Sequence, residues 1–319
     1  MKDYRYLSPE QVDLFLNHGY VVVKNAFDRE RAAEFTDTMW IRLGLDPQDK
    51  STWTKERIHM PYYRRVPVAD FAPKAWYAIQ DLLGGEERIA DSDSTWGDNF
   101  IVNFGRSDLE GSEPISPKDL DNWHVDGDFF VHYLDSPEQA LLVIPIFSDI
   151  KPSGGGTFIA PDGIGLVAQY LAKHSEGVLP TGFAFTPSNT TASPYSEDPE
   201  YFSHLEEVKK CQQFLEMTGE VGDVVLLHPL MLHSASENYL RVPRVITNPP
   251  VKLKEPFNFN RSRVEDYSLV ERKTLKALGL ECLDYQITTE RRRLVPKREI
   301  DEVKASEEER ARLAAAGKL

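Results

Sequence analysis

The chain has 319 residues, of which 41% are hydrophobic, so it can bury a sizeable core in one large or two modest domains. Its formal net charge of −14 gives no basic field to gather nucleic acid or anionic lipid, and a small molecule is the better expectation for its partner. Two cysteines without a Cys-x-x-Cys pair exclude a disulfide framework and a thiolate zinc site. This cysteine usage predicts a reducing, cytoplasmic compartment.

The ends of the chain and its apolar runs bear on membranes and targeting. The N-terminal residues lack the apolar stretch of a signal peptide, and runs such as Leu141 to Ile146 are too short to span a bilayer. We therefore expect no membrane partner. Gly317-Lys318-Leu319 only loosely resembles a peroxisomal address, because glycine replaces the usual serine-like residue, and we interpret it as a chance match.

The first elements have clear local signals. Ser8-Pro9-Glu10-Gln11 has the pattern of a capping box with proline at the first helical position, and it predicts a helix. After His18-Gly19, the β-branched and aromatic run Tyr20 to Val23 predicts a strand. Asp28 then predicts the start of a second helix that runs towards Leu43. The polar, irregular stretch that follows, residues 45–69, predicts a long loop.

From about Trp96 the pattern changes to short strands divided by glycine and proline. These predicted strands are Asn99 to Phe104, Trp123 to Phe130, Ala140 to Phe147, Thr157 to Ala160, Asp223 to His228 and Arg244 to Val251. Strands at such intervals, without amphipathic helices between them, favour an antiparallel barrel or sandwich over a parallel sheet. We therefore predict a mainly β fold, a barrel with helices packed outside it.

Beyond Pro256 charged residues dominate. Glu290-Arg291-Arg292-Arg293 and Glu307-Glu308-Glu309-Arg310 lie in helix-compatible stretches with little apolar face, so we expect solvated surface helices rather than a binding arm. The predicted organisation is a main domain over residues 1–255, which includes the N-terminal helices, and a charged helical extension over residues 256–319. The extension is expected to pack on the main domain or to trail from it.

The first chemical signal is His124-Val125-Asp126. Residues two apart in a strand project to the same face, so the imidazole and the carboxylate would lie side by side inside a barrel. By itself this pattern is weak evidence for a metal site. In a chain with 8 histidines, an aspartate two residues after one of them arises easily by chance.

A second signal lies more than a hundred residues downstream. Gly222-Asp223 leads into an apolar strand, and His233 follows just beyond the end of that strand. His233 would complete a facial triad of two histidines and one carboxylate, which suits iron(II) and leaves open coordination positions. Arg244 begins the next predicted strand. Its guanidinium can bind a carboxylate through two hydrogen bonds, as a dicarboxylic acid co-substrate would require.

In these segments the chain resembles the phytanoyl-CoA dioxygenase-like family of iron(II)- and 2-oxoglutarate-dependent oxygenases. The matching segments, from about residue 7 to 250, are LSPEQV, HGYVVV, WHVD, GGGTFIAP and GDVVLLHPLMLHS with the arginine that follows it. The resemblance implies a double-stranded β-helix, which is a jelly-roll, cupin-like barrel, for the domain over residues 1–255. It also implies iron(II) ligation by His124, Asp126 and His233, with 2-oxoglutarate and O2 as co-substrates.

The resemblance assigns further residues to the co-substrate. It implies that Arg244 binds the distal carboxylate of 2-oxoglutarate and that Thr157 contacts the co-substrate, with Asn103 as an additional candidate. Family members often have His-Gly-Ser after the distal histidine, whereas here Ser234 and Ser236 follow His233, and the choice between them stays open. The usual Pro-Gly-Ser-His after the Gly-Thr segment is replaced by residues 161–164, Pro-Asp-Gly-Ile. Neither departure touches the metal ligands.

The activity implied is oxidation of a small organic substrate by hydroxylation, desaturation or rearrangement, with release of succinate and CO2 from 2-oxoglutarate. Halogenation is not expected, because Asp126 stands where related halogenases have a small residue. Two alternatives stay open: a cupin-like metal-dependent isomerase or hydrolase without 2-oxoglutarate, and a non-catalytic barrel that binds a ligand. Family analogy alone suggests a homodimer. The substrate depends on loops such as 45–69 and 181–205, which contain no readable code.

Several other residues near the motifs have both a functional and a structural interpretation. Candidates for substrate contacts are Trp123, Asp128, Phe130 and Tyr133, although aromatic residues in strands more often belong to the core. His228 is an odd number of residues from His233, so on a continuous strand it faces the other way, and we expect a structural role. The three glycines at 154–156 lack the lysine of a phosphate loop and predict a tight turn.

Overall fold

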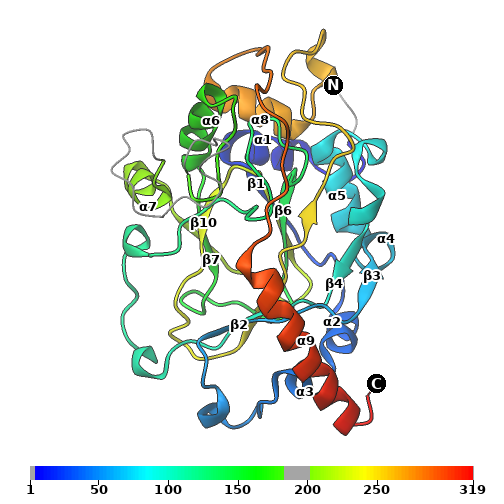
Figure 1. The fold of residues 1–319 in the computed structure, drawn as a ribbon, viewed down its shortest axis with the longest axis vertical. Coiled ribbons are helices and arrows are strands. Elements are labelled where there is room, and N and C mark those ends of the chain that lie inside the picture. The colour runs from blue at the N-terminus through cyan, green and yellow to red at the C-terminus, as the bar shows by residue number, and fades with distance from the viewer. Residues whose placement is uncertain (1–3, 183–201, 319) are drawn as a thin grey trace.

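Helices surround the sheets in the computed structural model, which describes residues 4–182 and 202–318 (Figure 1). The α-helices are α1 Pro9–His18, α2 Arg29–Thr36, α3 Met39–Leu43, α4 Val68–Phe71, α5 Pro73–Leu83, α6 Gly163–Lys173, α7 His204–Glu207, α8 Leu269–Leu278 and α9 Lys297–Ala315. Short 3-10 helices cover Lys50–Thr52, Glu86–Arg88, Asp91–Asp93, Ser107–Leu109, Pro117–Asp119, Val208–Lys210 and Val264–Asp266. Most of the loop at 181–205, expected to influence substrate choice, lies outside the described residues, as does Leu319.

The strands pair in four separate antiparallel sheets within the described residues. The strands are β1 Tyr20–Val23, β2 Arg57–His59, β3 Arg65–Pro67, β4 Thr95–Gly97, β5 Ile101–Asn103, β6 Leu141–Pro145, β7 Thr157–Ala160, β8 Leu215–Met217, β9 Val224–Leu227, β10 Leu232–Ser234, β11 Arg244–Ile246 and β12 Pro250–Val251. Their orders are β1-β9-β6-β12, β10-β7-β8, β11-β5-β2 and β3-β4. No sheet closes on itself among these strands, so the double-stranded β-helix stays a prediction.

The first predicted helix and the strand after it are confirmed. Ser8 accepts a hydrogen bond from the Gln11 amide and the Gln11 side chain accepts one from the Ser8 amide, which completes the capping box of α1. Gly19 ends this helix in the left-handed conformation (φ 74°), and β1 follows directly. The second helix is shorter than predicted, because α2 ends at Thr36 and α3 begins a separate helix at Met39.

The core lies around β9, whose four residues are all buried between β1 and β6. A central strand in contact with neighbours on both faces reads as a continuous apolar run, as Val224 to Leu227 does. At one end of this sheet, five phenylalanine rings from different segments pack together with centroid distances of 4.9–6.4 Å. These are Phe27, Phe35, Phe71, Phe100 and Phe147.

Three strand or loop predictions differ from the structure. The predicted strand over residues 123–130 is an irregular segment with isolated bridges. The strand is interrupted because Gly127 has a φ of +117°, whereas residues of an extended strand have a negative φ. The expected loop over residues 45–69 includes β2 and β3, which find partners in β5 and β4. The predicted strand over residues 244–251 is divided into β11 and β12, which pair in different sheets.

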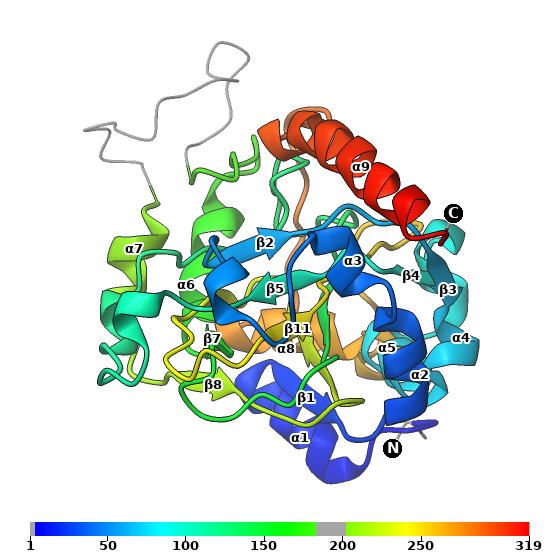
Figure 2. The same ribbon diagram turned by 90° about the horizontal axis from the view of Figure 1, so that it is seen from below.

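The C-terminal region packs against the rest of the chain at two places. α8 packs against α1 and α6, and α9 packs against α3 (Figures 1 and 2). Residues 290–293 are not helical, contrary to expectation, whereas residues 307–310 belong to α9. Glu309 is buried against Arg42, so this face of α9 is not solvated. None of the helices in the described residues is long and apolar enough to cross a membrane.

Candidate metal centre

His124 and His233 are brought together by a backbone pairing. Each backbone N–H donates to the other residue's carbonyl at 3.0 Å, so the two residues lie directly opposite one another in an antiparallel bridge. Residues paired in this way project their side chains to the same face. The two imidazole centroids are therefore only 4.3 Å apart. β7 extends the arrangement, because Ile159 pairs with His233 on the other side.

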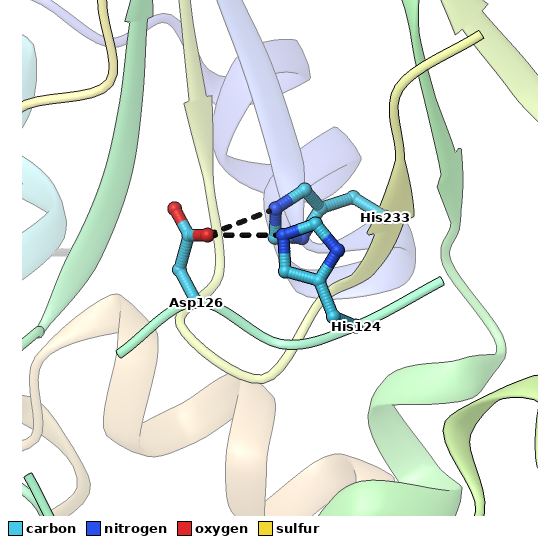
Figure 3. A group of neighbouring side chains, drawn as sticks. All are labelled: His124, Asp126 and His233. Carbon is cyan, nitrogen blue, oxygen red and sulfur yellow. Dashed lines mark ion pairs between the residues drawn. The ribbon is translucent and has the colours of Figure 1, made fainter. Parts of the chain in front are cut away.

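Asp126 points at the edges of both imidazoles (Figure 3). Its Oδ1 lies 3.2 Å from His124 Nε2 and 3.3 Å from His233 Nε2, and the three ligand atoms all lie within 4.8 Å of one another. Two atoms that bind one ion at about 2.1 Å and at right angles are about 3 Å apart. The spacing of these donors therefore fits a single metal ion, although the segment that bears them is not the predicted strand.

The backbone fixes the tautomer of both histidines. Nδ1 of His124 lies 2.7 Å from the Asn122 carbonyl, and Nδ1 of His233 lies 3.0 Å from the Met231 carbonyl. A carbonyl only accepts hydrogen bonds, so each Nδ1 has the hydrogen. In the neutral rings, both Nε2 lone pairs then face the negatively charged Asp126 oxygen. This arrangement is unfavourable unless a cation, either a proton or a metal ion, lies among the three atoms.

The electrostatics of the centre agree with a cation site. Burial alone would raise the pKa of Asp126, but when the imidazoles are protonated, the charge of His233 and the hydrogen bonds from both rings hold that pKa well below its usual range. Burial lowers the pKa of His124, and the hydrogen bond and charge of Asp126 outweigh it, so this pKa is raised. The His124 side chain is 37% exposed and that of His233 only 8%, so the centre opens on the His124 side.

Asn248 is a residue near the centre that the sequence analysis missed. Its amide Nδ2 donates to Asp126 Oδ2 at 3.4 Å, on the oxygen that faces away from the histidines. The contact leaves Oδ1 directed at both imidazoles. No motif marks Asn248, because it follows β11 and is 122 residues from its partner. The sequence offers one indirect signal. Asn248 is two residues after Ile246 and four after Arg244, so on a continuous strand all three side chains would project to the same face.

Arg244 is buried on β11, with 2% of its surface exposed, four residues before the Asn248 that contacts Asp126. Its Nε donates to the Gly155 carbonyl at 2.8 Å, and the carbonyl of Ile101 lies 3.4 Å from Nη1. Among residues 4–182 and 202–318, no carboxylate lies within 4.0 Å of its guanidinium. Burial, with a smaller effect from the charge of Arg57, lowers the pKa of Arg244 to about 9. A buried guanidinium without a counterion is costly, so an anion is expected to bind there.

Of the other predicted co-substrate residues, Asn103 lies opposite Arg244 and Thr157 lies on the strand that pairs with His233. Asn103 pairs with Arg244 across β5 and β11, and its amide donates to the Ser236 carbonyl at 2.9 Å. Thr157 is two residues from Ile159 on β7 and therefore shares a face with His233. The Ser236 hydroxyl donates to the Gly156 carbonyl at 2.7 Å, and the neighbouring Gly155 carbonyl accepts from Arg244. Ser236 is thus nearer to Arg244 in its contacts than Ser234, whose hydroxyl donates to the adjacent Ala235 carbonyl.

The four candidates for substrate contacts lie in different environments. Phe130 lines both a small cavity beside Asp126, of about 20 Å³, and a surface groove of about 1290 Å³ that extends towards α9. Tyr133 lines the small cavity but not the surface groove, and its hydroxyl forms a hydrogen bond with the Thr289 hydroxyl. Trp123 donates to the Pro117 carbonyl and packs edge-on against Phe214. Asp128 is exposed. Of the four, Phe130 has the position best suited to a substrate contact.

The other histidines near the motifs are not part of the group of three candidate metal ligands. His228 is fully buried, and its Nε2 lies 2.9 Å from the Thr274 hydroxyl, in agreement with the predicted structural role. His132 Nε2 bonds to the Gly127 carbonyl at 2.8 Å, so this nitrogen is a donor and offers no lone pair. Burial and the charges of His124, His132 and His233 lower the pKa of His204 to about 3. His204 lies on α7, where no sequence motif marks it.

Comparisons with known proteins give only weak similarities. No family model and no curated protein sequence matches the chain. The chain is similar to HygX from Streptomyces hygroscopicus, solved with nickel, 2-oxoglutarate and hygromycin B bound, at 13% identity over 78% of this chain and 88% of that chain, with a TM-score of 0.41. It is also similar to the non-heme alpha-ketoglutarate-dependent carbocyclase SnoK from nogalamycin biosynthesis, at 15% identity over 77% and 84% of the two chains, with a TM-score of 0.43.

A third solved structure is that of EctD from S. alaskensis with 2-oxoglutarate and 5-hydroxyectoine, at 16% identity over 79% of this chain and 77% of that chain, with a TM-score of 0.39. All three similarities are low in sequence and in superposition. A function for this chain is therefore proposed from the geometry of the triad and of Arg244, and not from these similarities.

Proposed function

We propose that this chain is an iron(II)- and 2-oxoglutarate-dependent oxygenase that oxidises a small organic substrate and releases succinate and CO2. The observation that supports it best is the convergence of His124 Nε2, His233 Nε2 and Asp126 Oδ1 on one point, together with a buried Arg244 that has no carboxylate partner among the described residues. Two histidines and one carboxylate are the donor set of non-haem iron(II) oxygenases. The two features together match a metal and a dicarboxylic acid.

The spacing along the chain supports the pairing of these two features. Arg244 and Asn248 are separated by four residues, which span at most about 14 Å. Asn248 contacts Asp126 and Arg244 lies at the other end of this run. In this proposal a five-carbon dicarboxylic acid binds with one end at the metal and the other at the guanidinium.

Each residue has a distinct role in this proposal. His124, Asp126 and His233 hold iron(II), which when bound supplies the redox chemistry that oxygen activation requires. The Asn122 and Met231 carbonyls keep the two imidazoles in the tautomer that directs Nε2 at the ion. Arg244 holds the distal carboxylate of 2-oxoglutarate through charge-assisted hydrogen bonds. The exposed side at His124 is the side from which a substrate approaches.

The finer assignments belong to the same proposal. We infer a phytanoyl-CoA dioxygenase-like subfamily and a double-stranded β-helix for residues 1–255, with residues 256–319 as an extension. Thr157 and Asn103 are proposed to support the co-substrate, and hydroxylation, desaturation and rearrangement all suit the site. Halogenation does not, because Asp126 fills the position that a halide would need. A cytoplasmic location and a homodimer stay predictions.

A cupin-like metal-dependent isomerase or hydrolase is the alternative from another class. It would use the same three ligands but has no need of a buried arginine without a counterion. The environment of Arg244 therefore favours a 2-oxoglutarate enzyme over this alternative. The triad of metal-type donors is what disfavours a non-catalytic barrel that only binds a ligand.

The proposal is tested with the full chain loaded anaerobically with iron(II). We expect 2-oxoglutarate to bind in calorimetry and succinate to form once oxygen is admitted. Asp126→Ala should abolish metal binding, whereas Arg244→Gln should retain the metal and lose most of its affinity for 2-oxoglutarate. Asp121→Asn, an exposed aspartate five residues before Asp126, is the matched control for metal binding. Iron binding without affinity for 2-oxoglutarate would favour the isomerase or hydrolase.

A further inference from the structure

Arg57 lies in the same cross-strand row as Arg244. β2 and β11 flank β5, and the register places Arg57 and Arg244 each directly opposite Asn103 (Figure 2). Directly opposed residues in antiparallel strands project to the same face, so all three side chains leave the sheet on one side. Strands two apart are separated by about 10 Å, a distance that two arginine side chains can close.

This face of the sheet points inwards, towards the strands that present His233 and Thr157. Asn103 is fully buried and donates to the Ser236 carbonyl, and Arg244 donates to the Gly155 carbonyl just before β7. The opposite face has a different environment, because the Phe104 ring packs against Trp40 and Trp53. Arg57 therefore extends towards the interior that holds the proposed co-substrate site.

The hydrogen bonding of Arg57 is incomplete. In the described residues its ion-pair partner is the adjacent Glu56, whose Oε1 lies 3.2 Å from Nη2. The Nε atom of Arg57 is buried and has no hydrogen-bond partner among the residues that the structure describes. The side chain as a whole is 23% exposed, so a small ligand can reach it. Arg57 also adds to the positive charge around Arg244, where its effect on the pKa of Arg244 is second only to that of burial.

We propose that Arg57 is a second anchor for the distal carboxylate of the 2-oxo dicarboxylic acid, acting beside Arg244 across the Asn103 amide. The inference rests on the proposed function. A carboxylate has two oxygens with about four acceptor positions, so it can accept from two guanidinium groups at once. Arg57 has the adjacent Glu56, but Arg244 has no carboxylate partner among the described residues, so an anion between the two guanidinium groups would be stabilised. The pair therefore selects dicarboxylic over monocarboxylic 2-oxo acids.

The test is calorimetric titration of the full chain, loaded with Mn(II) as a redox-silent substitute, with 2-oxoglutarate and separately with 2-oxobutanoate. The second acid keeps the chelating end but lacks the distal carboxylate. Arg57→Gln should weaken the binding of 2-oxoglutarate roughly tenfold or more, which is the range for the loss of a hydrogen bond to a charged group. The affinity for 2-oxobutanoate should not change. Arg57→Lys should recover part of the loss, because the charge returns without the planar fork.

Arg106→Gln is the matched control, since Arg106 is an arginine three residues after β5 that is half-exposed and paired with Asp108. Its affinities for both acids should equal those of the unmodified chain. An unchanged affinity of Arg57→Gln for 2-oxoglutarate would overturn this inference while the proposed function stands. Equal losses for both acids would also overturn it, because they indicate a structural role. If the unmodified chain binds Mn(II) but not 2-oxoglutarate, both the inference and the proposed function fail.

Discussion

At the scale of single residues, the geometry of the proposed metal centre depends on hydrogen bonds that point away from it. The carbonyls behind His124 and His233 determine which ring nitrogen has a lone pair, and Asn248 contacts the outer oxygen of Asp126. Groups in this position orient the ligands without touching the ion. The three ligand residues alone would not define the geometry.

Asn248→Ala is therefore expected to weaken metal binding about tenfold, the lower end of the range for residues that orient metal ligands. The lower end is appropriate because the bond to Asp126 is long, at 3.4 Å. Anaerobic titration with iron(II) or Mn(II) measures the change. Asn260→Ala removes an exposed amide of the same kind and should bind metal as the unmodified chain does. Equal affinities for all three proteins would show that Asp126 needs no such support.

At the scale of elements, α8 is held in place by a buried carboxylate near its N-terminus. Glu271 is fully buried, completes the capping box with Ser268, and accepts hydrogen bonds from Arg88 and Arg261. Burial by itself would raise its pKa, but the hydrogen bonds from Arg261 and Arg88 lower the pKa to about 2. This carboxylate links α8 to the segments before β4 and after β12.

Glu271→Gln should lower the free energy of unfolding at neutral pH by about 3 kcal/mol, the equivalent of the pKa shift. Because the folded pKa lies below the unfolded value of 4.5, the stabilisation is complete above about pH 5 and is lost as the pH falls towards 2. Denaturant unfolding should therefore show the two proteins converging in acid. Glu265→Gln changes an exposed carboxylate and should show no such convergence. A pH-independent difference would exclude the charge of Glu271 as the cause.

At the scale of the whole molecule, one buried arginine joins distant parts of the chain. Arg42 on α3 is fully buried and pairs at 2.8 Å with Asp98, beside β4, and with Glu309 on α9. It also donates to the Pro61 carbonyl. The backbone carbonyl of Arg42 in turn accepts from Arg312 at 2.6 Å. The position of the C-terminal helix is thus fixed by charges that lie inside the protein.

Arg42→Met should lower the free energy of unfolding by about 3–5 kcal/mol, because it leaves Asp98 buried without its principal cation. Chemical denaturation measures the loss, and limited proteolysis should cut the chain more readily near α9. Arg29→Met removes an exposed pair with Asp149 and should leave both readouts nearly unchanged. If Arg42→Met unfolds as the unmodified chain does, the ion cluster has no role in holding α9.

The sequence by itself determined the features that depend on neighbouring residues. The capping box at Ser8, the strands at residues 20–23 and 157–160, and the three residue types proposed to bind metal all follow from short patterns, whose physics is local. It misjudged residues 123–130, because only the structure revealed the left-handed turn at Gly127 that ends strand geometry between the metal motif and Phe130.

Only the tertiary structure decided which side chains share the site. Arg57, Asn248 and the carbonyls behind the histidines are set by strand register and by contacts between residues that are far apart in the chain. Register follows from packing of the whole core, and a shift of one residue would turn every side chain to the other face. His124, Asp126, His233 and Arg244 could therefore be proposed from the sequence, whereas Asn248, Arg57 and the carbonyls that orient the two imidazoles could not.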